Sequence, residues 1–89
     1  MRAIISVIGR DKKGIIAKVS GCLYGVSVNI EDISQTVMGD LFTMIMTADL
    51  SDASSDISHI NAALQEIAEE MRVEIRIQHE EIFNSMHKI

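Results

Sequence analysis

Residues 2–26 read RAIISVIGRDKKGIIAKVSGCLYGV, and the spacing of their apolar residues changes after Gly9. Residues 2–9 form a short β-branched run, which is typical of a strand buried on both faces. Beyond Gly9 the apolar residues recur at steps of three and four, the spacing of one helix face: Ile15, Ile16, Val19, Cys22, Leu23 and Val26. We therefore predict a strand followed directly by a helix, with Asp11 as its N-cap residue and Gly25 at its end.

The rest of the chain repeats this alternation of strands and helices. Residues 28–38 and 41–50 are two extended runs joined at Gly39-Asp40, which predicts a hairpin with a two-residue type II′ turn. A second helix is predicted from apolar residues spaced 3, 4, 3 and 4 apart, namely Ile57, Ile60, Leu64, Ile67 and Met71. Residues 72–78 alternate apolar and polar side chains, as a half-exposed strand does.

The predicted order is β-α-β-β-α-β, which indicates a ferredoxin-like α+β sandwich formed by residues 1–89 as a single domain. Right-handed crossovers give an antiparallel four-stranded sheet of order 4-1-3-2, with the two helices on one face. A short amphipathic C-terminal helix is predicted from one apolar stripe, Ile82, Phe83, Met86 and Ile89.

Composition narrows the classes of function. The net charge of the 89 residues is −5, which disfavours nucleic acid as a partner. Cys22 is the single cysteine, so no intramolecular disulfide is possible, and its position on the apolar stripe favours core packing. No apolar run is long enough to span a bilayer, and Met1 leads directly into the first strand without room for a signal peptide. We expect a cytoplasmic protein that binds no membrane.

No residue cluster indicates catalysis or metal binding. The sequence has no nucleophile elbow, phosphate loop, Cys-x-x-Cys or His-Glu-x-x-His motif. The run His79-Glu80-Glu81 lacks a further ligand for a zinc site. Glu31 and Asp32 are adjacent on a predicted strand, so their carboxylates are expected to point to opposite faces. We expect a protein that is not an enzyme and needs no metal or cofactor.

The segment GRDKKGII, residues 9–16, is where a binding site is most plausible. Residues 10–18 carry four cations and one acid, a local charge of +3, while the remainder of the chain carries −8. Cations at a helix N-terminus oppose the helix dipole, and such conflicts often mark function. The free N–H groups of a helix start attract carboxylates and phosphates. Gly9 and Gly14 would let a ligand touch the backbone, and Asp11 could bind an amine; ordinary surface charges and turn glycines are the alternative.

These residues form a pattern that resembles a known family. The loop Gly9-x-Asp11-Lys12-x-Gly14-Ile15, followed by Val28-Asn29-Ile30 at the start of the second strand, resembles the ACT domain, a regulatory module of amino-acid metabolism. The likeness runs nearly end to end, through residues 29–35 to Ile82-Phe83. In this extent the chain is similar to the small stand-alone ACT proteins related to the glycine cleavage system regulator.

The resemblance implies a non-catalytic domain that pairs with a second copy through the edges of strand 2. A small ligand, commonly an amino acid, then binds between the first loop and strand 2. Carried over by position, the loop wall would comprise Asp11, Lys12, Gly14 and Ile15, and the strand wall Asn29 and Ile30. Many ACT loops have proline before the glycine, where this chain has Lys13, so amino-acid specificity does not follow automatically.

Two hypotheses about function remain open at this stage. In the first, the chain is a regulatory domain that senses an amino acid or related small carboxylate at a homodimer interface. In the second, it is a structural dimerisation or adaptor domain without a ligand. Residues 28–38 favour a homodimer independently of the resemblance, because an edge strand this long would otherwise leave its backbone N–H and C=O groups unpaired.

Overall fold

The computed structural model describes residues 1–10 and 13–81, and their elements follow the predicted order. The strands are β1 (Arg2–Arg10), β2 (Asn29–Met38), β3 (Leu41–Asp49) and β4 (Glu74–His79), and the helices are α1 (Ile15–Gly25) and α2 (Ile57–Met71). The sheet is antiparallel with the order β2-β3-β1-β4, which confirms the predicted order read from its other end. The predicted C-terminal helix falls in residues 82–89, outside the described residues.

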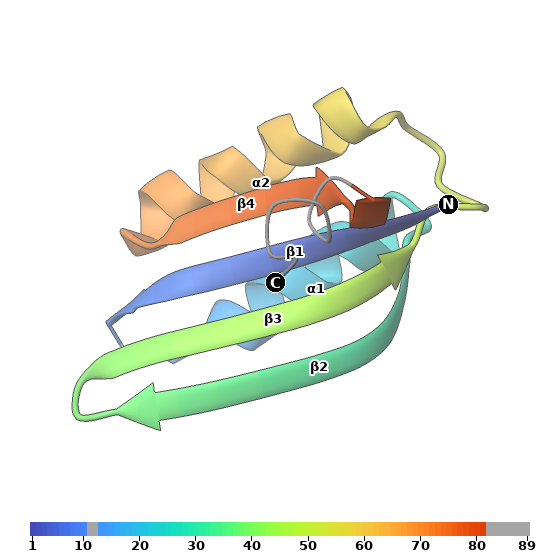
Figure 1. Ribbon diagram of the computed structural model, residues 1–89. Helices are drawn as coiled ribbons and strands as arrows, with labels where there is room; N and C mark the ends of the chain where they lie inside the picture. The colour runs from blue at the N-terminus through green and yellow to red at the C-terminus, as the bar shows by residue number, and fades with distance from the viewer. Residues whose placement is uncertain (11–12, 82–89) are drawn as a thin grey trace.

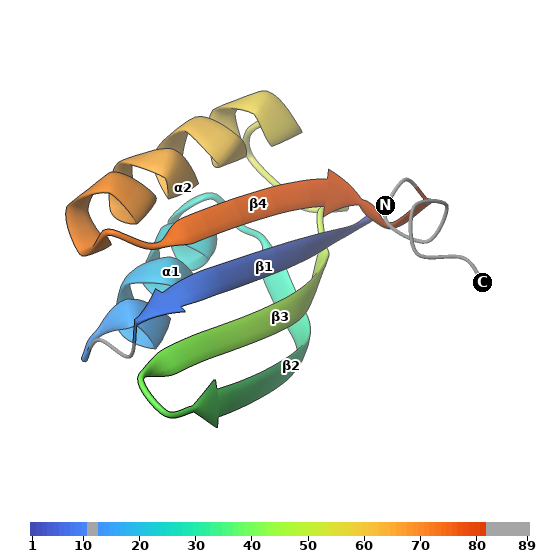
Figure 2. The same ribbon diagram turned by 60° about the vertical axis from the view of Figure 1, so that its left-hand side comes forward.

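The fold has two layers, with both helices packed against the same face of the sheet (Figures 1 and 2). Alternate residues of the central strands face these helices and are buried: Ala3, Ile5 and Val7 from β1, and Phe42, Met44, Met46 and Ala48 from β3. The methionines of β3 therefore fill the core beneath the helices. On the other face of β1, Ile8 is 42% exposed, so the prediction that this strand is buried on both faces is wrong.

The hairpin between β2 and β3 has the predicted two-residue turn. Met38 pairs with Leu41, which leaves Gly39 and Asp40 as the turn residues. Gly39 has a φ of +63°, and Asp40 is not among the residues with positive φ, a combination that fits type II′. An ion pair between Arg10 and Asp40 ties the turn to the end of β1.

The first helix begins later than the prediction allowed. Its N-cap residue is Gly14, with a φ of +89°, so the prediction of Asp11 as N-cap is wrong. Ile15 is only 2% exposed and packs in the core, which anchors the first turn at this point. The left-handed conformation of Gly14 turns the chain into the helix immediately before Ile15, a role that suits glycine. The helix ends at Gly25, as predicted.

Two glycines of this region are expected to respond oppositely to alanine. Gly21 lies inside α1, and among the described residues no atom outside its chain neighbours and the helix's own backbone lies within 4 Å of the place that an added Cβ would take, so Gly21→Ala should stabilise the fold by about 1 kcal/mol. Gly14 also has open space, but its positive φ should make Gly14→Ala destabilising by about 1–2 kcal/mol. Urea unfolding of both variants measures whether the free energy of unfolding rises or falls in each. A loss of stability in Gly21→Ala would show that the exposed side of α1 is closely covered.

Gly9 is required by packing between β1 and the segment that precedes β4. A Cβ at this position would lie 2.6 Å from Cγ1 of Val73. The close approach follows from the end of α2, where Arg72 adopts a left-handed conformation with a φ of 57° and directs the chain back toward β1. For the same reason β4 begins at Glu74 rather than at residue 72. Packing against Val73 thus explains why residue 9 is a glycine, and no ligand is needed to explain it.

The clash predicts a destabilised variant with a specific rescue. Gly9→Ala should lower the free energy of unfolding by about 1–3 kcal/mol, the usual cost of overpacking. Adding Val73→Ala removes the nearest atom, Cγ1, and leaves the Cβ of residue 73 at 3.0 Å, so the rescue should be partial and the double variant more stable than the sum of the two single effects. A double-mutant cycle by urea unfolding tests this coupling. Strict additivity would mean that Val73 is not what constrains Gly9.

Strand β2 contains a bulge that changes which way its acidic residues face. Ile30 pairs with Ala48 and Asp32 with Thr47, so Glu31 is the extra residue. Its carboxylate forms an ion pair of 2.9 Å with Arg2, which lies on the uncovered face of the sheet. The register puts Asp32 on that face as well. The expectation that these two carboxylates point to opposite faces is therefore wrong.

Candidate ligand-binding site

The predicted loop wall lies at the start of α1, where the described chain resumes at Lys13. Gly14 is exposed, whereas the side chain of Ile15 is buried in the core, so Ile15 can offer a ligand little more than its backbone N–H. The predicted ligand-binding residues Asp11 and Lys12 are outside the described residues, and their roles stay a prediction. Of the predicted loop wall, the structure thus describes only Gly14 and Ile15, and these offer a ligand mainly their backbone groups.

The N-terminus of α1 is open in the described chain. The first helical bond runs from the N–H of Lys18 to the carbonyl of Gly14, at 2.9 Å. No side chain caps the helix start, and its first turn contains no acidic residue. The preceding N–H groups, those of residues 15–17, therefore have no acceptor among the described residues. Such a group of donors at the positive end of a helix dipole suits a carboxylate or another small anion.

The predicted strand wall lies at the start of β2. Ile30 is half-buried and pairs with Ala48, so it is on the helix side of the sheet. Asn29 is exposed and pairs with Asp49, whose side chain is on the uncovered face with Arg2. The two residues of this wall thus lie on opposite sides of the edge strand, at its very beginning.

Asn29 lies beside the carboxylate of Asp49, its partner in the sheet register. This carboxylate accepts hydrogen bonds from the hydroxyl of Ser51, at 2.6 Å, and from its backbone N–H, at 3.0 Å. These bonds, the hydroxyl's above all, hold the pKa of Asp49 below its ordinary value. The N-terminal amine lies 4.0 Å from the same carboxylate. Asp49 is therefore ionised well below neutral pH.

Within one chain the two predicted walls are at opposite ends of the molecule (Figure 1). Arg10, after which the loop begins, pairs with Leu41, which pairs with Met38 at the end of β2. At the other end of the sheet, Arg2 pairs with Asp49, which pairs with Asn29. The length of β2 separates the end of the sheet at Arg10 from the end at Asn29 by about 25–30 Å. A single protomer does not bring Gly14 together with Asn29.

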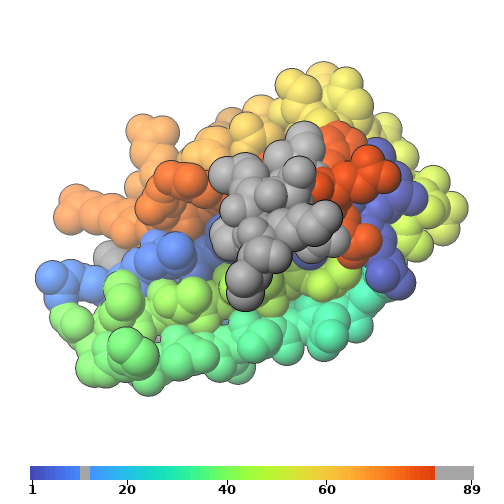
Figure 3. Space-filling model, viewed as in Figure 1, coloured from blue at the N-terminus to red at the C-terminus, as the bar shows by residue number. Residues whose placement is uncertain are grey.

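The whole of β2 is an uncovered edge of the sheet. It pairs with β3 alone among the described strands, and it forms one free rim of the molecule in Figure 3. Three of its apolar side chains are largely exposed: Ile33 at 43%, Val37 at 53% and Met38 at 68%. Register puts Ile33 and Val37 on the helix side, so the helices do not extend far enough to cover this edge.

The remaining reactive groups of the described chain are separate from this site. Cys22 is partly buried against the core, and burial, with a smaller contribution from Glu66, raises the pKa of its thiol. No group of three or more histidine, cysteine, aspartate or glutamate side chains converges on a possible metal position within the described residues. No helix there has the length and apolar character needed to cross a bilayer.

Comparison with known proteins identifies the family. Residues 2–78 match the model of the ACT domain, so the chain belongs to the ACT domain family. A UPF0237 protein of Methanococcus maripaludis is 52% identical over 86 residues, which cover 97% of this chain and 96% of that protein. The likeness to small single-domain ACT proteins is thereby confirmed.

Solved structures agree with this family. The ACT domain protein from Streptococcus pneumoniae has a TM-score of 0.80 and 41% identity, with 93% of both chains covered. The regulatory subunit of aspartate kinase from Thermus thermophilus has a TM-score of 0.67 and 26% identity over 86% of this chain and 50% of that one. ACT domains generally act in regulation by binding ligands rather than by catalysis.

Proposed function

We propose that this protein is a non-catalytic regulatory domain that binds an amino acid or a related small carboxylate at the interface of a homodimer. The observation that supports this most is the distance between the two predicted walls within one chain. A site made of Gly14 and Asn29 needs two copies, and the uncovered β2 edge offers the surface through which two copies can meet.

A two-fold pairing of β2 strands would bring the two walls together and would also cover the free edge of the sheet. Two such strands run antiparallel, so the beginning of one lies beside the end of the other. The partner's Asn29 would then be level with Met38 and with the loop that leaves Arg10. The same pairing would bond the free backbone edge and cover Ile33 and Val37. Each dimer would have two equivalent sites, each composed of one loop and the other chain's strand.

The chemistry of the two walls suits a zwitterion. The open N–H groups at the start of α1, with Lys12 and Lys13 nearby in the sequence, suit a carboxylate. The N-cap position is held by Gly14, and we assign the carboxylate of Asp11 to the amine of the ligand; the amide of Asn29 can accept from the same amine or donate to the carboxylate. This division of roles favours a free amino acid.

Thermal unfolding with defined ligands tests the proposal. An equimolar mixture of the twenty amino acids at millimolar concentration, and then each one alone, should raise the melting temperature of the wild-type protein. Asp11→Ala and Asn29→Ala should abolish the rise. Asp52→Ala and Asn61→Ala, which make the same chemical changes at exposed positions elsewhere, should retain it. No rise with any amino acid or small carboxylate would contradict ligand sensing and favour the structural dimerisation domain.

A further inference from the structure

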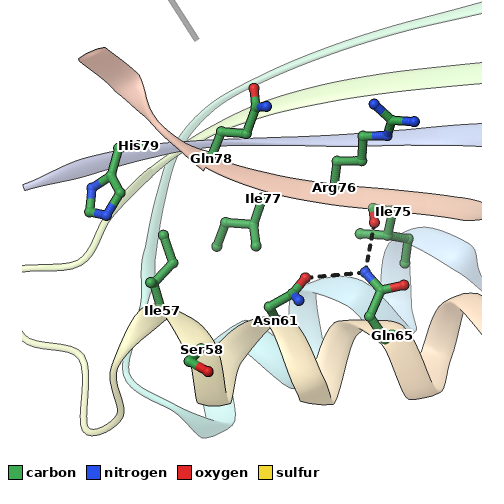
Figure 4. Close-up of a pocket in the computed structure, with 9 residues that line it drawn as sticks. All are labelled: Ile57, Ser58, Asn61, Gln65, Ile75, Arg76, Ile77, Gln78 and His79. Carbon is green, nitrogen blue, oxygen red and sulfur yellow. Dashed lines mark hydrogen bonds between the residues drawn. The ribbon is translucent and has the colours of Figure 1, made fainter. Parts of the chain in front are cut away.

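A second groove lies on the other side of the molecule from β2, between α2 and β4. It has a volume of about 490 Å³, and the side chains and backbone that matter to its chemistry belong to Ile57, Asn61, Gln65, Ile75, Ile77 and His79. Figure 4 shows Asn61 and Gln65 pointing from α2 toward β4, with Ile77 pointing back toward the helix. None of these residues belongs to the site proposed above.

The backbone of β4 presents unused hydrogen-bonding groups to this groove. β4 is the second edge of the sheet and pairs only with β1 among the described strands. The carbonyl of Ile75 accepts a hydrogen bond of 2.7 Å from Nε2 of Gln65, so it points away from β1. Backbone groups alternate in direction along an antiparallel strand, so the N–H and C=O of Ile77 point the same way. No backbone group of the described chain bonds them.

The hydrogen bonds also fix the orientation of two side-chain amides. A backbone carbonyl can only accept, so Gln65 must direct its NH₂ group at Ile75. The same Nε2 donates to Oδ1 of Asn61, at 3.2 Å. Oε1 of Gln65 and Nδ2 of Asn61 are consequently left as one acceptor and one donor without a described partner. Both groups belong to side chains of α2, across the groove from Ile77.

The position of α2 limits what can pair with β4. α2 lies beyond β4 at this edge in both Figures 1 and 2, so a whole folded domain that paired with β4 would meet α2. A single extended segment needs less room than a folded domain and could contact α2 without displacing it. Ile57 and Ile77 are both half-buried and line the groove, which leaves an apolar contact for one side chain of such a segment.

We propose that this groove binds an extended peptide segment of another protein, which adds to β4 as a fifth strand. The main chain of the peptide would bond Ile77 on one side and meet the amides of Asn61 and Gln65 on the other. One apolar side chain of the peptide would rest on Ile57 and Ile77. A regulatory domain needs a surface for the protein it controls, and this groove is independent of the β2 edge that the ligand site uses.

A displayed library of random linear peptides, selected on the full-length protein, provides the probe. Ile77→Pro is the decisive variant, because it removes an N–H that the sheet does not use, and proline is tolerated at such edge positions. We expect selected peptides to bind Ile77→Pro at least about tenfold more weakly than wild type, while Ile77→Val binds normally. N-methylation of a selected peptide should weaken binding only at alternate positions, a pattern that does not rely on any protein variant.

Hydrogen exchange distinguishes the other occupants of the groove. In the free protein the amide of Ile77 should exchange readily at every protein concentration, and the peptide should protect it. Protection in the free protein that disappears in Phe83→Asp would mean that the chain's own C-terminal segment fills the groove. Protection that grows with protein concentration would mean that a second copy does. Either result would overturn the proposal, as would peptides that bind wild type and Ile77→Pro equally.

Discussion

Val37→Lys is expected to convert the proposed homodimer into a monomer. The side chain is 53% exposed on the helix side of the β2 edge, where two-fold pairing would bring it against the other protomer. A lysine at an edge strand opposes strand pairing because its charge would be desolvated, and the symmetry introduces the change twice. The dimer should weaken by at least about 2 kcal/mol, or roughly thirtyfold in Kd. Sedimentation equilibrium over a range of concentrations measures this.

Two controls separate a specific effect from general loss of stability. Val37→Thr preserves a β-branched side chain without charge and should remain dimeric. Ile8→Lys places the same charge on β1, at a side chain exposed to a similar extent but away from β2, and should also remain dimeric. Val37 is an exposed position, so its lysine variant should fold as stably as a wild-type monomer. Its urea midpoint should therefore be close to that of wild-type protein diluted until it is monomeric. A wild-type protein that is monomeric at every concentration would refute the pairing itself.

The monomeric variant is also expected to lose its response to amino acids. All six predicted site residues remain in Val37→Lys, so a site contained in one chain would still bind. For the wild-type protein, a ligand at one hundred times its Kd stabilises the folded state by about 2.7 kcal/mol, which corresponds to a rise of about 10 °C or more in melting temperature for a domain of this size. In Val37→Lys the rise should vanish. Thermal unfolding with the amino-acid mixture gives this comparison directly.

An unchanged rise in the monomer would have a different meaning from the failures described above. It would show that a ligand binds within one chain, at some place other than a site shared by Gly14 and Asn29. Asn29→Ala in the dimer provides the matching measurement, since it should abolish the rise without changing the sedimentation behaviour. Loss of both dimer and response in Asn29→Ala would instead point to a structural role at the edge.

The elements and their order could be predicted because local patterns determine them. The 3, 4, 3, 4 spacing from Ile57 to Met71 matches α2 from end to end, and Gly39-Asp40 forms the predicted turn. The start of α1 could not be predicted in the same way. Aspartate is a better N-cap than glycine by local preference. The burial of Ile15 and the left-handed conformation of Gly14 decide the start instead, and both depend on the tertiary fold.

Other features depend on contacts between segments far apart in the sequence. Gly9 is constrained by Val73, which reaches it only because Arg72 turns the chain at the end of α2. The bulge at Glu31 follows from how β2 matches β3, and strand alternation alone gives the wrong face for its carboxylate.

For the candidate site, the sequence indicated the residue types but not their separation. The separation follows from the topology, because α1 runs from the end of the sheet at Arg10 back to the opposite end, where Asn29 begins β2. The groove beside β4 was missed altogether. The signal for it in the sequence was the pair Asn61 and Gln65, two amides four residues apart on α2.

Mixed dimers test most directly whether each site is shared between two chains. Asp11→Ala and Asn29→Ala proteins, each unable to bind alone, are unfolded together, refolded and titrated with the amino acid that stabilises the wild type. In a shared site, a mixed dimer has one site with both changes and one with neither, so random pairing should recover about one quarter of the wild-type binding capacity at wild-type affinity. If both functional residues of a site came from the same chain, no intact site would form, and the mixture would bind no more than its components.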